Sequence, residues 1–450
     1  MAITVTSHSR RGLPVWGARA VALLLSLVAA CATVLLTPTT ASAHPLSTSA
    51  ILLDIGPNQV TGQIQLPIDR LAIAINQPGL TTTKAAQSTK TEEIRQYIAA
   101  HVSASDATDE APWDVSVTGG HVETIDGVDH LVYDIALRPS KGPSQDFELH
   151  YNAIVDRLLS HKVFVSSRPA GTEAYTAVGL VDWESHTLTV PVQGATLEQG
   201  FLAAIQLGIH HIAEGADHLL FLLMLLLPAP LLAQRHQWVR TDNLRRNWWR
   251  VVHVVTAFAI GHSITLALAA FGYLHAPARL VESMIALSIL VSGLHAVRPI
   301  IRGGEIWIAA GFGLMHGLAF AALLGQIDLG RGSLVTELFG FNLGIELTQL
   351  LVVALVMPSL LVLSRTRAYP AVRLALAALG VVLAAAWLAE RTTLINTNPL
   401  EPVSNALVAH PIPVVAVLAL AAATAWSVPG WRVPPDQTAA AGTGATPAAA

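Results

Sequence analysis

The spacing of hydrophobic residues changes twice along the chain. One apolar stretch lies at 18–36, residues 44 to about 195 alternate between hydrophobic and polar positions, and long apolar runs fill most of the remainder. Alternation with a period of two predicts half-buried β-strands, whereas about 20 apolar residues suffice for a helix that crosses a bilayer. The pattern therefore predicts a β-rich domain followed by a membrane domain.

The chain is expected to begin with a secretory signal peptide over 1–43. Two arginines precede the apolar stretch and small residues follow it up to Ala43, which is the order of a cleaved export signal. Cleavage there would make His44 the first residue, and its amine and imidazole could bind a metal together. The alternatives are a lipoprotein signal in which Cys31 is lipidated and a twin-arginine signal, to which Ser9-Arg10-Arg11 bears a weak likeness.

Residues 44–195 are expected to form one small, sandwich-like, extracytoplasmic β-domain. The strictest alternation lies at 60–66, 131–137 and 147–151. One amphipathic helix should interrupt the strands, because Thr89 and Glu92 have capping-box spacing and apolar residues follow at helical intervals.

Six apolar runs are expected to cross the membrane within 196–391. They lie at 199–227, 250–272, 278–298, 305–326, 333–363 and 371–389. Thr196 and Gln199 could cap the first run, which would then form a continuous rod of ~31 residues and roughly 46 Å. Residues 392–450 would supply an outer loop, a candidate seventh span at 410–428 and an Ala/Pro-rich cytoplasmic tail. The expected fold class is thus a polytopic all-α membrane bundle of six to seven transmembrane helices, preceded by the β-domain.

The arginines predict how this bundle is oriented. With the β-domain outside, three arginines fall in outer loops, namely Arg279, Arg331 and Arg391. Eleven fall in inner loops: Arg235, Arg240, Arg245, Arg246, Arg250, Arg298, Arg302, Arg365, Arg367, Arg373 and Arg432. Because arginine accumulates on the cytoplasmic side, we expect a multi-pass plasma-membrane protein with an extracytoplasmic N-terminal domain.

The composition excludes several other classes. Charged residues are 12% of the chain and hydrophobic residues 52%, so the chain has about half the charge of an ordinary soluble domain. The net charge of −4 offers no basic surface for nucleic acid, which is not an expected partner. The single cysteine excludes a disulfide framework and a cysteine-based metal site. The 18 histidines are unusual for so apolar a chain.

Five potential metal ligands lie on one face of the first predicted span. They are His210, His211, Glu214, Asp217 and His218, which fall within about 120° of arc at 100° per residue. Ionisable side chains at membrane depth are costly and by default functional. A metal site is therefore a stronger interpretation of this group than a purely structural role.

The later spans add further polar groups, several of them expected near mid-depth. These are His262, His316, Glu346, Glu282, Asn342 and Gln349. Single intramembrane histidines are more often hydrogen-bonding struts, which is the interpretation for His253 and His295. The spans contain no lysine and have arginine only at their ends, so their carboxylates are expected to lack a fixed cation and to attract a mobile one.

The ligand types narrow the choice of metal. Imidazole and carboxylate suit Ni²⁺, Co²⁺, Zn²⁺ or Cu²⁺, whereas Cu⁺ prefers thiolate and thioether. The spans contain no cysteine, and their methionines are scattered. A divalent transition-metal ion is therefore the expected substrate, and no organic cofactor is expected.

At these motifs the chain resembles the HupE/UreJ family of hydrogenase and urease accessory membrane proteins, particularly the branch with an extracytoplasmic N-terminal domain. Residues 211–218 are similar to that family's His-Pro-x-x-Gly-x-Asp-His signature, with Ile212 where proline often stands. Further similar motifs are His262–Thr265, Glu282–Ser288, Gly313–Gly317 and Phe341–Gln349. The chain departs from the family at Leu294–His295, where an acidic-polar pair would be expected. The resemblance covers about 200–390 and implies a permease for nickel, or for cobalt or another divalent metal.

We therefore expect a metal permease rather than an enzyme. Its site would combine His211, Asp217, His218, His262, His316 and Glu346, with Glu214 and His210 beside the site or at its entry. One alternative is an intramembrane metal-dependent hydrolase that acts on lipid, with Ser263 near the metal. Another is a non-transporting assembly factor. The expected partners are the metal ion and the lipid bilayer. Metalloenzyme maturation proteins are further candidate partners.

Overall fold

The computed structural model describes most of the chain between Thr48 and Val433. Short gaps in the described residues fall at 78–79, 81–90, 126–127, 159–160, 184, 235–236, 242, 275, 301–304, 326–330 and 396–397. The predicted signal peptide, with Cys31 and His44, and the Ala/Pro-rich tail lie outside the described residues.

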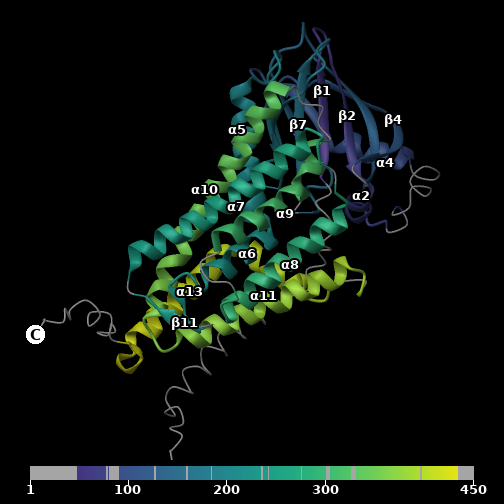
Figure 1. The fold of residues 1–450 in the computed structure, drawn as a ribbon. Helices are drawn as coiled ribbons and strands as arrows, with labels where there is room; N and C mark the ends of the chain where they lie inside the picture. Colours follow the sequence, from purple (N-terminus) through teal and green to yellow (C-terminus); the bar gives the residue numbers. More distant parts are fainter. Residues whose placement is uncertain are drawn as a thin grey trace, which may run out of the picture.

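Among the described residues, two β-sheets and two short helices form the domain in the upper part of Figure 1. The larger sheet has the order β4-β5-β2-β1-β7-β8, and its strands are β1 (Ser49–Ile55), β2 (Val60–Pro67), β4 (Asp114–Ile125), β5 (Val128–Arg138), β7 (Val163–Pro169) and β8 (Thr176–Val181). The smaller sheet has the order β3-β6-β9, with β3 (Val102–Asp106), β6 (Phe147–Tyr151) and β9 (Thr187–Val190). The helices are α2 (Ile68–Ala74) and α4 (Thr91–His101). Only β1 and β7 pair in parallel among these described strands.

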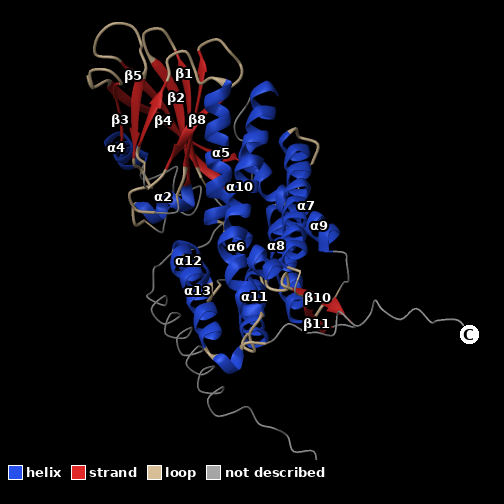
Figure 2. Cartoon of the chain, turned by 90° about the vertical axis from the view of Figure 1, so that its left-hand side faces the viewer, coloured by secondary structure: helices blue, strands red, loops and turns tan. Residues whose placement is uncertain are grey.

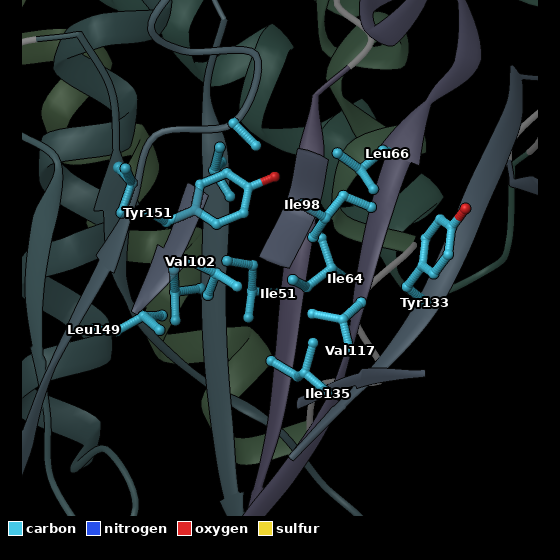
Figure 3. Close-up of a cluster of buried hydrophobic side chains, with 14 of the residues drawn as sticks. Ile51, Ile64, Leu66, Ile98, Val102, Val117, Tyr133, Ile135, Leu149 and Tyr151 are labelled. Carbon is cyan, nitrogen blue, oxygen red and sulfur yellow. The ribbon is translucent and has the colours of Figure 1, made fainter. Parts of the chain in front are cut away.

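The core of this β-domain lies between the two sheets. Ile51, Ile64 and Tyr133 of the larger sheet are fully buried, as are Leu149 and Tyr151 of the smaller one (Figure 3). The predicted strands 60–66, 131–137 and 147–151 are confirmed as β2, β5 and β6, and the predicted amphipathic helix corresponds to α4. Alternation identified these strands because only one face of each strand enters the core.

The rest of the chain is mainly helical. Its helices are α5 (Leu197–Glu214), α6 (Ala216–Leu226), α7 (Leu244–Ala270), α8 (Ala278–Val297), α9 (Glu305–Gly325), α10 (Arg331–Ser364), α11 (Tyr369–Arg391), α12 (Glu401–Ala409), α13 (Pro411–Ser427) and the short η2 (Pro429–Trp431). A hairpin of β10 (Leu231–Gln234) and β11 (Gln237–Arg240) joins α6 to α7 (Figure 2).

Several of these helices can cross a bilayer. Within the described residues, α7, α8, α10 and α11 are long and apolar enough, and the bent pair of α5 and α6 would make a fifth span. The protein is therefore a multi-pass membrane protein. The expected six to seven spans are not confirmed, since the side chains of α9 are described only up to Leu318 and α13 has 17 residues.

The first predicted span is not the continuous rod that its apolar pattern suggested. The capping box of Thr196 and Gln199 is present, but α5 ends at Glu214 and α6 leaves it at an angle of 68°. Gly215 joins them with a ψ of 99°, which is outside the helical region. The two halves pack against different neighbours, α5 against α10 and α6 against α8, so the chain bends at its glycine.

The β-domain packs directly against α5 and α10 (Figure 2). Leu207 of α5 contacts an apolar cluster that includes Phe164 and Leu180 of the larger sheet. Glu337 of α10 is buried and accepts a hydrogen bond of 3.2 Å from the backbone N–H of Ala177 on β8. Part of α5 is therefore covered by protein, and the β-domain reaches down to the level of the bend.

Candidate metal centre

Close packing of α7 against α9 places two histidines opposite each other. A Cβ added to Gly313 would lie 2.1 Å from the carbonyl oxygen of Phe258, and one added to Gly317 would lie 2.2 Å from that of His262. Only glycine permits so close an approach of two backbones. As a result, His262 and His316 both point into the interior, where they are 0% and 1% exposed.

Four histidines and one aspartate converge at the bend between α5 and α6. The ligand atoms of His211, His218 and His262 lie within 4.8 Å of one another, as do those of Asp217, His218 and His316. His218 belongs to both groups, and its ring centre is 4.5 Å from that of His211 and 5.2 Å from that of His316. Three separate parts of the chain thus supply potential ligands to one small volume.

Asp217 fixes the orientation of His218. Its Oδ1 atom accepts hydrogen bonds of 2.9 Å from both the backbone N–H and the ring Nδ1 of His218. A carboxylate accepts only, so Nδ1 carries the proton and Nε2 has the lone pair. This Nε2 atom is buried and has no hydrogen-bond partner among the described residues. The pair therefore presents a nitrogen that is ready to bind a metal.

Ser288 of α8 fixes His316 in the same way. Its hydroxyl donates to the carbonyl oxygen of Ile285 at 2.7 Å and lies 3.0 Å from Nε2 of His316. Because the single hydroxyl proton is used on the carbonyl, Ser288 accepts from Nε2–H of His316. The lone pair of His316 is then on Nδ1, which is buried without a partner among the described residues.

Aromatic rings surround this cluster. Phe258 and Phe221 lie 5.1 and 5.2 Å from the ring of His316, and Phe341 lies 5.4 Å from that of His211. An apolar wall strengthens the electrostatic attraction between the ligands and a cation. The arrangement can therefore hold a borderline divalent cation by imidazole nitrogens with one carboxylate close by.

Residues 187–391 match the model of a protein family described as HupE / UreJ protein. This segment is a HupE/UreJ domain. The match confirms the resemblance drawn from the motifs, and it includes every residue of the cluster. Of the β-domain, the match covers only the residues from 187 onward, which include the strand β9. No curated protein and no solved structure matches the chain.

The other candidates on α10 of the HupE/UreJ domain lie outside the two ligand groups. Glu346 accepts a hydrogen bond of 2.7 Å from the hydroxyl of Thr256 on α7. Asn342 lies beside His262 and donates to the carbonyl of Leu338 at 2.8 Å. Gln349 is buried one turn further along. These polar groups form a row that leads away from the cluster along one face of α10.

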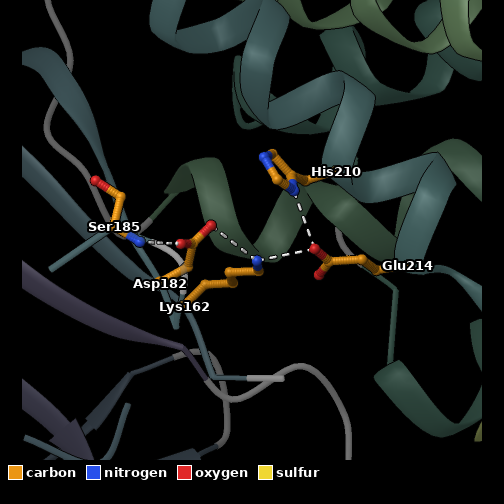
Figure 4. A network of polar contacts seen from close by, with 5 residues as sticks. All are labelled: Lys162, Asp182, Ser185, His210 and Glu214. Carbon is orange, nitrogen blue, oxygen red and sulfur yellow. Dashed lines mark hydrogen bonds and ion pairs between the residues drawn. The ribbon is translucent and has the colours of Figure 1, made fainter. Parts of the chain in front are cut away.

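Two carboxylates of the HupE/UreJ domain have a fixed cation after all. Glu282 pairs with Arg391 at 3.1 Å, and Glu214 pairs with Lys162 of the β-domain at 2.8 Å. Glu214 also lies 2.9 Å from Nδ1 of His210 (Figure 4). The expectation of unpaired carboxylates is therefore wrong for both, because their partners come from distant parts of the chain.

The two histidines interpreted as struts are placed apart from the cluster. His295 accepts a hydrogen bond of 3.1 Å from the backbone N–H of Ile300, and its ring packs on Trp238. His253 is exposed.

Two polar residues with clear roles in the structure were not among the site residues predicted from the sequence. Glu337 is a carboxylate within the predicted span 333–363 and could have been counted there. In the sequence, nothing marked Ser288 as a site residue except its position at the end of the motif Glu282–Ser288.

Proposed function

We propose that this protein is a permease for a divalent transition-metal ion. The observation that carries the proposal is the convergence of His211, His218, His262 and His316 with Asp217 in the interior of a multi-pass membrane domain. Three buried imidazoles and a fourth, half-buried one that converge in this way are costly unless something binds them. Membership of the HupE/UreJ family in this segment supports transport-related metal handling as the purpose.

The ligands favour nickel or cobalt over copper(I). They are nitrogen and oxygen atoms, and the described part of the cluster contains no sulfur ligand. Each imidazole must be unprotonated to bind, so metal binding and proton release are linked. We propose that metal crosses the membrane in exchange for protons, and that Glu346, Asn342 and Gln349 line the next part of its path.

The broken first span is consistent with transport. Discontinuous helices at membrane depth are tolerated where they line a binding site, and transporters use them in this way. Gly215 lies at such a break, between His211 and His218. The excess of inner arginines supports the proposal that the β-domain lies outside the cell and meets the metal first.

Of the alternatives, the lipid hydrolase gains no support from Ser263. Its hydroxyl donates to the carbonyl oxygen of Ala259 at 2.7 Å, which is the usual bond of a serine within a helix. Only a measurement of metal flux distinguishes a non-transporting assembly factor from a permease.

Reconstituted vesicles test the proposal. Purified full-length protein in proteoliposomes that contain a metal-sensitive dye should take up Ni²⁺ or Co²⁺, and Asp217→Ala should abolish the uptake. His253→Ala, which changes an exposed histidine of the same domain, should leave uptake unchanged. Absence of flux for Ni²⁺, Co²⁺, Zn²⁺ and Cu²⁺ alike would overturn the proposal.

A further inference from the structure

A small cavity lies where the larger sheet of the β-domain meets α5 and α10, three elements that adjoin in Figure 2. Its volume is about 30 Å³, which leaves room for about two water molecules. Most of its lining is apolar and includes Phe164 and Leu180 of the sheet, Leu207 of α5 and Phe341 of α10. No residue of the two ligand groups is among its described lining residues, so the cavity is a separate feature of the boundary between the domains.

Two buried polar side chains line this cavity. Glu337 of α10 is 5% exposed, and one of its oxygens accepts the hydrogen bond of 3.2 Å from the backbone N–H of Ala177. Ser166 of β7 is 1% exposed, and its hydroxyl has no partner among the described residues. Ser166 is paired in register with Ala177, so it lies beside the strand that binds the carboxyl group. A buried hydroxyl without a partner, in the same cavity as a carboxyl group, indicates a small polar ligand.

The described surroundings of Glu337 offer it no cation. Among the described residues that line the cavity, Glu337 alone is ionisable. Arg168, near the end of β7, pairs with Asp54, and Glu198 of α5 is exposed. Further along α10, Glu346 is bonded to Thr256 of α7. An ionised carboxylate in an apolar cavity without a cation is costly, and binding a proton removes that cost.

The site exists only while the β-domain is docked. Position 200 on α5 is a glycine, and a Cβ there would lie 3.0 Å from Oε1 of Glu337 and 3.2 Å from Cγ2 of Thr176 on β8. The carboxyl group is thus enclosed by α5 on one side and by β8 on the other. Separation of the domains would remove the Ala177 N–H and the Ser166 hydroxyl from the carboxyl group and admit water.

We propose that this cavity is a proton-binding site between the domains, in which Glu337 carries a proton and shares a bound water molecule with Ser166. The neutral carboxyl group suits the site because it has one oxygen to accept from Ala177 and one O–H to donate to the water. The water in turn donates to the Ser166 hydroxyl. The proposal goes beyond the proposed transport function, because it concerns how the β-domain is held on the HupE/UreJ domain.

A pH dependence of docking follows. In water a glutamate side chain loses its proton at about pH 4.3, so at neutral pH the separated domains bind one proton fewer than the docked ones. Docking is therefore strong at low pH and weakens as the pH rises, by up to about tenfold per pH unit for a single proton.

Infrared spectroscopy of the purified full-length protein tests for the proton itself. At about pH 7 the wild-type protein should show the C=O stretch of a protonated carboxyl group that is lost in Glu337→Gln. Glutamine has nearly the same shape as a neutral glutamic acid, so this variant should fold and dock. Glu198→Gln, which changes an exposed carboxylate of α5, should leave the protonated carboxyl band unchanged.

Hydrogen exchange of the β8 amides tests the docking. After correction for the intrinsic exchange rate, protection should fall by about tenfold or more between about pH 6 and 9 in the wild-type protein. Protection in Glu337→Gln should not change over this range, and Glu198→Gln should behave like the wild type. Ser166→Ala should move the fall in protection to lower pH by about one unit, because the proton loses a hydrogen bond through the water.

A difference spectrum between wild type and Glu337→Gln that contains only bands of an ionised carboxylate would overturn the proposal. Carboxylate bands that shift between Na⁺ and K⁺ would indicate a metal-ion site instead and would overturn it as well. The same pH dependence of exchange in Glu337→Gln and wild type would contradict the docking role. None of these outcomes bears on metal flux, which tests the proposed function separately.

Discussion

Both domains bury histidines, but they treat them differently. In the β-domain, the buried His130 and His161 and the half-buried His101 belong to no group of potential metal ligands, and each has a ring nitrogen within 2.7 to 2.9 Å of an oxygen, although Nδ1 of His161 has no partner among the described residues. In the HupE/UreJ domain, four histidines from three parts of the chain converge, and His218 and His316 each keep one buried nitrogen without a partner among the described residues. A single buried nitrogen without a partner does not distinguish the two domains, whereas the convergence of several imidazoles indicates a ligand. The comparison shows that convergence, not the number of histidines, identifies the site.

The largest expected effect comes from removing the residue shared by both ligand groups. His218→Ala should lower metal flux by more than about 100-fold, since each group loses a ligand. Flux into proteoliposomes is the measurement, and membrane insertion should remain intact. Equal effects of His218→Ala and His253→Ala on metal flux would show that the convergent histidines matter no more for transport than the solitary ones.

A smaller effect is expected at the bend. In Gly215→Ala the new Cβ would lie 2.7 Å from Nδ1 of His218 and 2.6 Å from the carbonyl oxygen of His211. One of them must move, so Co²⁺ affinity in equilibrium dialysis should fall by about tenfold or more. Gly311→Ala on α9 meets nothing within 4 Å and is the matched control. Normal Co²⁺ affinity in Gly215→Ala would show that the bend does not position the ligands.

Ser288 should have a more modest effect because it acts through His316. Ser288→Ala removes the acceptor for Nε2–H, which lets the ring adopt the wrong tautomer, and Co²⁺ affinity should fall by about tenfold. Ser288→Thr keeps the hydroxyl and should restore affinity. Ser292→Ala, one turn along on α8, removes only a bond to a backbone carbonyl and should bind Co²⁺ normally. Failure of Ser288→Thr to rescue binding would argue for packing rather than tautomer control.

The smallest effect concerns stability of the β-domain alone. Burial lowers the pKa of His161 to about 3. An unfolded imidazole takes up a proton near pH 6.5, so between about pH 6.5 and 3 the unfolded chain binds more protons than the folded one. Stability is therefore full above about pH 6.5 and falls as the pH drops below it.

Hydrogen exchange of the β1 and β7 amides between pH 7.5 and 5 measures this loss of stability. His161→Gln should show a shallower dependence on pH, because glutamine does not titrate. An unchanged dependence in His161→Gln would mean that other groups cause it.

Much of the fold could be predicted because local spacing determines it. Alternation identified β2, β5 and β6, and apolar length identified α7, α8, α10 and α11. The strand β7 is mostly a buried run rather than an alternating one, because Val163 and Val165 face the core of the β-domain while Phe164 lies in the cluster that contacts Leu207 of α5. Spacing along one strand cannot reveal that a helix from another domain covers its second face.

The candidate ligands were also visible in the sequence, and the five that converge were among the six named for the site, but the ion pairs of the neighbouring carboxylates were not visible. A regular helix would place Glu214 and Asp217 on one face, whereas the bend at Gly215 sends Glu214 to Lys162 and Asp217 to His218. The pairing of Glu282 with Arg391 joins residues far apart in the chain. Such contacts depend on how helices pack, which the pattern of a single chain does not specify.

X-ray absorption at the nickel edge of the purified, Ni²⁺-loaded protein tests the central claim most directly. The account predicts nitrogen and oxygen neighbours at about 2.0–2.1 Å with the outer-shell scattering of several imidazoles. His218→Ala should reduce the imidazole scattering, and His253→Ala should leave it unchanged. Nickel that keeps a shell of water alone, or binds sulfur, or gives the same spectrum in His218→Ala, would contradict the account.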